Sequence, residues 1–350
     1  MKIDRIQFYV EDARASRDWF VHKLGFQAVA SDVSDCTCTE VVKSGPVYFV
    51  LSSPLTPVSP VAKFLRQHPS GVADIAFQVE DVEAVMSRAL AHGAKAIQSI
   101  QQHQQGKGYV KWGKIAAWGA LTHTFIERHA CESGIVGEPN MFTGIDHVVL
   151  NVATGDLERA VDWYQKTLDF QLKQTFKIQT DRSALHSQVM VSRNGCVQLP
   201  INEPASPNSQ IQEFLDVNRG PGIQHIALQT PNIVRAIAQL RACGVSFLPV
   251  PANYYTHLQH RQGLPLSAAE IEEIANQQIM VDWQATTCHA VLLQIFTQPI
   301  FGQPTFFFEL IERRVGAAGF GEGNFRALFE AMEREQIKRG TLQDFDITSP

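Results

Sequence analysis

GIDHVVLNVATGDLERAVDWYQKTLDFQLK, residues 144–173, has a counterpart at the start of the chain, KIDRIQFYVEDARASRDWFVHKLGFQAV, residues 2–29. Both segments open with Ile-Asp and a basic residue, continue with alternating apolar positions, and close with Asp-Trp-aromatic and then Leu-x-Phe. Trp19 and Trp163 are 144 residues apart, and the Leu-x-Phe motifs keep the same offset. Because an internal repeat decides the architecture of a whole chain, this match is the starting point for the fold.

Two further pairs of segments match in the same order. GVADIAFQVEDVEAVMSRALAHGAKAI, residues 71–97, resembles GIQHIALQTPNIVRAIAQLRACGVSFL, residues 222–248, and a weaker match relates residues 122–129 to residues 306–314. The longer pair predicts a short strand, a helix with apolar residues at 3.6 spacing, and a glycine stop. The chain is therefore predicted to be two copies of one β-rich α+β module, each an open half-barrel with a concave face.

This pattern resembles the vicinal oxygen chelate superfamily, in which βαβββ units form a cup around a metal. We expect a degenerate first module without metal ligands at residues 1–135 and a catalytic module at residues 144–350. The Gly- and Pro-containing stretch from about residue 130 to 143 is predicted to link them. NFRALFEAMEREQIKRG, residues 324–340, is predicted to form a terminal helix that acts as a lid.

Composition limits the classes of function. With 45% apolar residues, 19% charged residues and a net charge of −5 in 350 residues, the chain is a folded globular protein without a basic surface for nucleic acid. No apolar run is long enough to span a bilayer, and the N-terminus lacks the features of a signal peptide. We therefore expect a cytoplasmic protein whose partners are small molecules.

Comparison of the two copies identifies three positions at which the needs of the fold do not explain the residue type. The second copy carries His147, His225 and Glu309 on its matched strands. The first copy has other residues at the same places: Arg5, Asp74 and Thr124. Two imidazoles and one carboxylate form the facial triad of non-haem iron(II) oxygenases. A single strand histidine is more often a core residue, but a buried carboxylate in an apolar strand requires a partner, and a cation supplies one. We predict a metal site.

The second half resembles the 4-hydroxyphenylpyruvate dioxygenase family over about 190 residues. The motifs that carry the resemblance are GIDHVVLNV (144–152), LPINEP (199–204), SQIQEFL (209–215), GIQHIALQT (222–230), LLQIFTQP (292–299), PTFFFELIERR (304–314) and GFGEGNFRALFEAMEREQ (319–336). The first half matches the family mainly in pattern and not in motif.

The resemblance implies roles for individual residues. His147, His225 and Glu309 match the family's iron ligands. Four residues match catalytic positions of the family. Ser187, Asn202 and Gln224 match a polar group in the substrate pocket, and Gln294 matches a residue beside the metal. Six further residues match substrate-binding positions: Gln210, Phe296, Phe307, Phe320, Asn324 and Phe325. Without the resemblance, the polar residues would be interpreted as ordinary sheet polarity, Phe307 as core, and Asn324 as a helix cap.

The implied reaction uses Fe(II), 4-hydroxyphenylpyruvate and O₂. It comprises oxidative decarboxylation, ring hydroxylation and side-chain migration, and it yields homogentisate and CO₂ for tyrosine catabolism or for tocopherol and plastoquinone biosynthesis. The family also implies a homo-oligomer, either a dimer or a tetramer.

Three alternatives remain at this level. A 4-hydroxymandelate synthase shares the fold, iron site and substrate, although Pro200, Asn202 and Phe296 favour the ring-hydroxylating enzyme. A glyoxalase-type metal lyase or isomerase usually draws its ligands from both modules. A metal-free binding protein of the same fold is the third. The glycines of GFGEGNF, residues 319–325, have the wrong spacing for a nucleotide loop.

Overall fold

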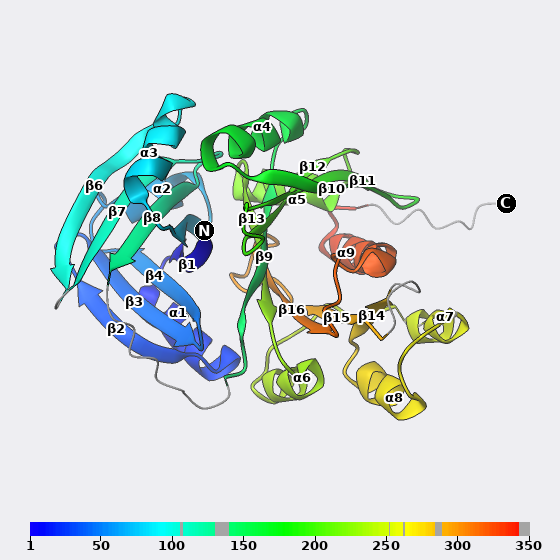
Figure 1. The fold of residues 1–350 in the computed structure, drawn as a ribbon. Coiled ribbons are helices and arrows are strands. Elements are labelled where there is room, and N and C mark those ends of the chain that lie inside the picture. The colour runs from blue at the N-terminus through cyan, green and yellow to red at the C-terminus, as the bar shows by residue number, and fades with distance from the viewer. Residues whose placement is uncertain (106–107, 130–139, 252, 262, 284–288, 343–350) are drawn as a thin grey trace.

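The protein forms two eight-stranded sheets, one in each half of the chain, and Figure 1 shows the two halves side by side. The structure, a computed structural model, describes residues 1–105, 108–129, 140–251, 253–261, 263–283 and 289–342. The strand orders are β2-β3-β4-β1-β5-β8-β7-β6 and β10-β11-β12-β9-β13-β16-β15-β14, so the second sheet repeats the first position by position. None of the helices in the described ranges is long and apolar enough to cross a membrane.

The elements of the first half are β1 (Lys2–Tyr9), α1 (Ala13–Leu24), β2 (Gln27–Val33), β3 (Thr37–Ser44), β4 (Val47–Pro54), α2 (Pro60–Gln67), β5 (Gly71–Gln78), α3 (Val82–Ala91), β6 (Ala96–Gln105), β7 (Gly108–Ala116) and β8 (Thr122–His129). Those of the second half are β9 (Gly144–Asn151), α4 (Leu157–Leu168), β10 (Gln171–Gln179), β11 (Ala184–Val191), β12 (Gln198–Pro204), α5 (Gln210–Asn218), β13 (Gly222–Gln229), α6 (Ile233–Ala242), α7 (Tyr254–His260), α8 (Ala268–Asn276), β14 (Met280–Trp283), β15 (Val291–Phe296), β16 (Phe307–Arg314), η1 (Glu322–Asn324) and α9 (Phe325–Arg339).

Each half is itself built from two βαβββ units. In the first half, β1 and β5 pair antiparallel at the centre of the sheet, β1 pairs parallel with β4, and β5 pairs parallel with β8. The second half repeats this arrangement with β9, β13, β12 and β16. The predicted fold of two tandem half-barrels with a terminal helix is confirmed, and each half-barrel contains two copies of the unit. The predicted linker falls largely on residues 130–139, outside the described ranges.

The second half departs from the repeat between α6 and β14. There the chain forms α7 and α8, whereas the first half passes directly from α3 to β6. Ser267 and Glu270 start α8 with a capping box, in which each side chain accepts from the backbone N–H of the other residue. This insertion has no counterpart in the first half, so comparison of the repeats did not predict it.

The two faces of the second sheet have different neighbours. One face packs on the first half: Phe306 and Phe308 contact Phe8 and Phe49, with ring centroids 5.1 Å apart for Phe306–Phe8 and 5.7 Å for Phe308–Phe49. Burial of each such ring stabilises the fold by about 2–3 kcal/mol. The alternate residues of β16, Phe307 and Glu309, project from the other face, which curves around α9 (Figure 1).

Helix α4 joins the two halves. Its buried Tyr164 hydroxyl lies 3.0 Å from Nε2 of His123, which belongs to β8 of the first half. Burial lowers the pKa of His123 to about 3, so this imidazole is neutral. The halves therefore share a continuous core with a polar contact inside it.

Candidate metal centre

His147, His225 and Glu309 lie on three adjacent strands at the centre of the second sheet: β9, β13 and β16. Ala227 of β13 lies opposite both His147 and Glu309 in the strand register. Because residues two apart on a strand share a face, His225 projects from the same face as Ala227. The small side chain of Ala227 leaves room for the longer side chains on either side to meet.

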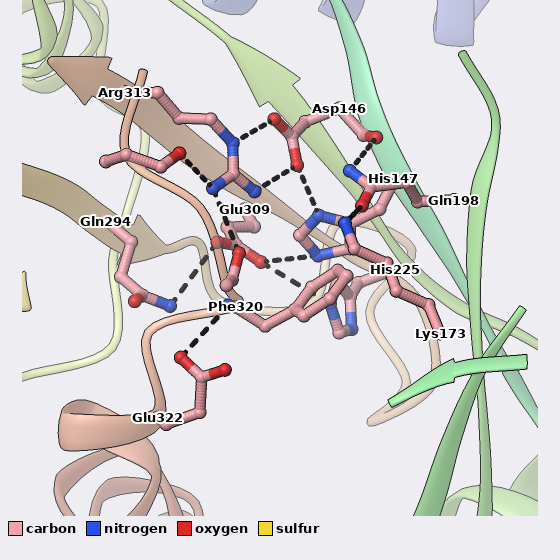
Figure 2. Close-up of polar contacts among 12 residues, drawn as sticks. Asp146, His147, Lys173, Gln198, His225, Gln294, Glu309, Arg313, Phe320 and Glu322 are labelled. Atoms are coloured by element: carbon pink, nitrogen blue, oxygen red, sulfur yellow. Dashed lines mark hydrogen bonds and ion pairs between the residues drawn. The ribbon is translucent and has the colours of Figure 1, made fainter. Parts of the chain in front are cut away.

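The structure brings the three predicted ligands together. One ligand atom from each residue lies within 4.8 Å of the other two. Oε2 of Glu309 is 3.1 Å from Nε2 of His147 and 3.5 Å from Nε2 of His225 (Figure 2). All three side chains come from the second half, and no described residue of the first half joins this group.

His147 is held from its other nitrogen by Asp146. Nδ1 of His147 lies 2.8 Å from Oδ1 of Asp146, and the two carboxylate oxygens of Asp146 accept from Nη2 and Nε of Arg313 at 2.8 and 2.7 Å. Burial opposes ionisation of Asp146, but Arg313 and His147 keep its pKa well below the usual value. A carboxylate bound to the far nitrogen fixes the imidazole orientation and leaves Nε2 as the ligand atom.

The electrostatics of the centre suit a cation. Burial disfavours a charged imidazole, yet Glu309 and Asp146 raise the pKa of His147 to about 9. Burial likewise disfavours ionised Glu309, but His147 and His225 hold its pKa below the usual value. Burial lowers the pKa of His225. Asp146 at Nδ1 and Glu309 at Nε2 thus stabilise positive charge on the ring of His147, and a metal cation at Nε2 fits the donor set.

A cavity opens from this centre. Nine of the ten predicted catalytic and substrate-binding residues line it: Ser187, Asn202, Gln210, Gln224, Gln294, Phe296, Phe307, Phe320 and Phe325. The metal candidates line it as well, so the cavity wall combines the three donors, a few amide and hydroxyl groups, and many apolar side chains. This composition is typical of a pocket for a small aromatic molecule.

Asn324, the tenth predicted residue, has a different place. It precedes α9, but its side chain makes no capping hydrogen bond. Its Nδ2 donates to Oε1 of Gln294 at 3.1 Å, and its Oδ1 accepts from the hydroxyl of Tyr254 at 2.7 Å. Asn324 therefore occupies the N-cap position of α9, as its helix N-terminal place in the sequence indicates, but its side chain does not cap the helix. Asn324 lies behind Gln294, whose Nε2 donates to Oε1 of Glu309 at 3.3 Å.

The sequence did not point to several residues of the cavity. Phe176 of β10 contacts Phe320 and Phe325, with ring centroids 6.3 and 5.2 Å apart, and Ile178 follows it on the same face. Other cavity residues missed in the sequence are Val149, Leu185, Val189, Ile211, Leu328, Phe329 and Met332. The alternation of Phe176 and Ile178, in a strand whose other residues apart from Leu172 are polar, was the one signal for a buried face.

Comparisons with known proteins agree with this geometry. The chain matches the Glyoxalase/Bleomycin resistance protein/Dioxygenase superfamily over residues 2–115 and 144–261. It is 37% identical to the 4-hydroxyphenylpyruvate dioxygenase of Coccidioides posadasii, covering 97% of this chain and 94% of the relative. Identity is also 37% with that of Dictyostelium discoideum, covering 97% and 99% of the two chains.

A solved structure is similar along almost the whole chain. A mutant form of 4-hydroxymandelate synthase from Streptomyces coelicolor superposes with a TM-score of 0.85 at 28% identity, covering 96% of this chain and 98% of that one. The repeat, the clustered donors and the full-length similarity agree. The chain belongs to the 4-hydroxyphenylpyruvate dioxygenase family within this superfamily.

Proposed function

We propose that this protein is an Fe(II)-dependent dioxygenase that converts 4-hydroxyphenylpyruvate and O₂ into homogentisate and CO₂. The observation that carries the proposal is the convergence of His147, His225 and Glu309 in the wall of a mainly apolar cavity. Two imidazoles and a carboxylate leave coordination positions open, as in non-haem iron(II) oxygenases. The relatives at 37% identity support the choice of substrate.

Three side chains would hold the iron: His147, His225 and Glu309. When bound, ferrous iron supplies the redox chemistry with O₂ and a cation that a 2-oxo acid can chelate. Asp146 keeps Nε2 of His147 directed at the centre, and Gln294 hydrogen-bonds to Glu309, so two of the three donors are held in place from outside.

The polar residues of the cavity are proposed to bind the polar groups of the substrate. Oε1 of Gln210 is buried and has no hydrogen-bond partner among the described residues. An unsatisfied buried acceptor costs about 1–3 kcal/mol, and a substrate hydroxyl would remove that cost. Ser187 and Asn202 are neighbours across β11 and β12, and Gln224 is buried beside His225. This group would orient the ring relative to the metal.

The aromatic residues are proposed to hold the substrate ring and exclude water. Phe296 and Phe307 come from the sheet, whereas Phe320 and Phe325 come from the terminal segment. The rings of Phe320 and His147 are 5.2 Å apart and nearly perpendicular. Because these side chains enclose the metal end of the cavity, they would protect reactive species from solvent.

We assign the chemistry to the module at residues 144–350 and a supporting role to residues 1–135. In the first half, Arg5 and Thr124 lie opposite Ala76, one on each side. In the second half, His147 and Glu309 lie opposite Ala227 in the same way. Arg5 donates to Asp4, the residue before it. We further propose that the protein is a homo-oligomer, which light scattering of the purified protein would test.

Product analysis tests the function. Protein reconstituted anaerobically with ferrous ion and then given 4-hydroxyphenylpyruvate and O₂ should consume O₂ and release homogentisate and CO₂ in equal amounts. The control is the same protein without iron, which should consume no O₂.

A second candidate, 4-hydroxymandelate synthase activity, is favoured by the full-length structural similarity to such an enzyme. It predicts hydroxymandelate as the main product in the same assay, and that product would overturn the proposal. Absence of O₂ consumption by iron-loaded protein would instead support a lyase, an isomerase or a binding protein of this fold.

A further inference from the structure

Arg313 lies at the end of β16, four residues beyond Glu309, and its guanidinium contacts two parts of the molecule at once. Nε and Nη2 donate to both carboxylate oxygens of Asp146. Nη1 donates to the backbone carbonyls of Ala317 at 3.1 Å and Gly319 at 2.9 Å (Figure 2). The side chain is only 13% exposed, so these contacts fix the guanidinium in one position.

The first part reached by Arg313 is the metal centre. Asp146 is the partner of Nδ1 of His147, so Arg313 orients the carboxylate that orients this ligand. Replacing the residue that holds a ligand commonly changes metal affinity by about 10–100-fold, and Arg313 keeps that residue, Asp146, in place.

The second part is the loop that carries Phe320. Val315, Gly316, Gly319 and Gly321 all have positive φ, between 50° and 84°, and this conformation is sterically costly for Val315 because it is a β-branched residue. Such a loop keeps its shape only when its surroundings hold it. The two hydrogen bonds from Arg313 to its carbonyls provide this support, and the loop places Phe320 on the ring of His147.

A second connection runs from Glu309 to the same segment. Glu309 accepts from Gln294, which accepts from Asn324 at the start of α9. Gly321 packs so closely on Gln294 that an added Cβ would lie 1.6 Å from Oε1 of Gln294. Two of the proposed metal ligands are therefore tied to the segment that closes the cavity: His147 through Asp146 and Arg313, and Glu309 through Gln294.

The first half contains an ion pair equivalent to Arg313–Asp146, but this pair does not hold a metal ligand. Arg128 and Asp4 occupy the positions of Arg313 and Asp146 and form a salt bridge. There the carboxylate binds Arg5 in place of a histidine, and Arg128 is 34% exposed. The ion pair is thus a common element of the repeat, and its contact with a metal ligand and a closing loop is specific to Arg313.

We propose that Arg313 is a positioning residue that couples the metal centre to the terminal segment, residues 315–339, so that metal binding and closure of this segment stabilise each other. The inference rests on the metal site proposed above. Because coupling between two sites is reciprocal, loosening the segment far from the metal must also weaken metal binding.

Two measurements on the full-length protein test the coupling. Ferrous affinity is measured anaerobically by competition with a chelator, and hydrogen exchange of the α9 amides is measured with and without ferrous ion. In the wild type, ferrous ion should slow exchange across α9. Arg313→Gln should bind ferrous ion about 10–100-fold more weakly and lose the effect of the metal on α9. Arg128→Gln, the matched control in the first half, should change neither measurement.

Two further variants separate coupling from general damage. Arg313→Lys keeps a cation beside Asp146 but cannot reproduce the fork of hydrogen bonds, so it should recover more affinity than Arg313→Gln without restoring protection of α9. Glu333→Gln weakens the contacts of α9 with Thr180 and Ser183, away from the proposed ligands. It should lower ferrous affinity by about 5-fold or more.

The outcomes are distinct. If the wild type binds ferrous ion but α9 exchange does not respond, or if Glu333→Gln and Arg313→Gln keep wild-type affinity, the coupling is wrong and the metal site stands. If the wild type binds no ferrous ion, the proposed function fails first. Faster exchange in β1 and β5 of Arg313→Gln would indicate unfolding of that variant. The ferrous affinity of Glu333→Gln then decides whether the coupling exists.

Discussion

The two halves of the protein have the same backbone plan but different chemistry. At the centre of the first sheet, Ala76 has Arg5 on one side and Thr124 on the other. At the centre of the second sheet, Ala227 has His147 and Glu309 in the same places. Strand register is therefore equal in the two halves, and the side chains on one face decide which half carries two imidazoles and a carboxylate at this position.

Other pairs are kept in both halves because they serve the frame. Glu127 accepts from the backbone N–H of Val82 at the start of α3, and Glu312 accepts from that of Ile233 at the start of α6. A carboxylate at a helix N-terminus satisfies free N–H groups and the helix dipole. Glu312 therefore has a structural role that Glu127 shares. Comparing the halves thus separates residues that build the module from residues that give it a function.

Removing a donor from the second half should have the largest effect. Glu309→Gln replaces the anionic ligand with a neutral amide, so ferrous affinity should fall by more than about 100-fold and turnover with it. Anaerobic chelator competition measures the affinity. Glu312→Gln on the same strand should lower stability while keeping ferrous affinity, and wild-type turnover in Glu309→Gln would contradict the assigned role.

The contact shared by the halves should make stability depend on pH. The folded pKa of His123 is about 3, below the ordinary 6.5, so the unfolded chain takes up a proton that the folded protein does not. The contribution of neutral His123 to the free energy of unfolding is complete above pH 6.5 and is lost as pH falls toward 3. Between pH 6.5 and 5 the loss is about 2 kcal/mol.

Urea unfolding at several pH values measures this loss. His123→Gln can still hydrogen-bond to Tyr164 but does not titrate, so its stability should fall less over the same range. His22→Gln, at an exposed position of α1, is the control. Equal pH dependence of His123→Gln and the wild type would exclude His123 as the cause.

Truncation of the cavity aromatics should have a smaller effect. Phe325→Ala and Phe176→Ala remove rings that contact each other over the cavity, so KM for 4-hydroxyphenylpyruvate should rise by about 10-fold, equivalent to about 1.4 kcal/mol. Iron content should stay close to that of the wild type, because neither ring is a donor. Loss of iron in either variant would indicate a structural role instead.

The smallest effect is expected in the first half. Asp74 occupies the position of His225, but it accepts from Thr122 and lies 3.6 Å from Nζ of Lys114. Asp74→Asn should therefore leave ferrous affinity and turnover within about 2-fold of the wild type, since this half supplies no donor. A larger loss of affinity would mean that the halves are not chemically separate.

Much of the fold can be predicted from the sequence because the repeat is recognisable from strand alternation and helix periodicity. The match of Ile-Asp-Arg5 to Ile-Asp-His147 placed both residues at equivalent register positions, as the structure has them. The three candidate donors were identified by their difference from Arg5, Asp74 and Thr124, and the structure brings them together.

The features that the sequence did not reveal depend on contacts between distant segments. Arg313 and Asp146 are 167 residues apart, and nothing in either motif marks their ion pair. Phe176 lies on an edge strand whose inner face is defined only once the terminal segment packs on it. The insertion of α7 and α8 has no partner in the first half, so repeat comparison offered no template for it.

The central claim is that one face of the second sheet, and not the equivalent face of the first, holds a ferrous ion. A crystal structure of the protein soaked anaerobically with ferrous ion tests it directly. We predict one strong anomalous iron peak within coordination distance of Nε2 of His147, Nε2 of His225 and a carboxylate oxygen of Glu309. Iron bound elsewhere, or these three side chains pointing apart around an empty centre, would contradict it.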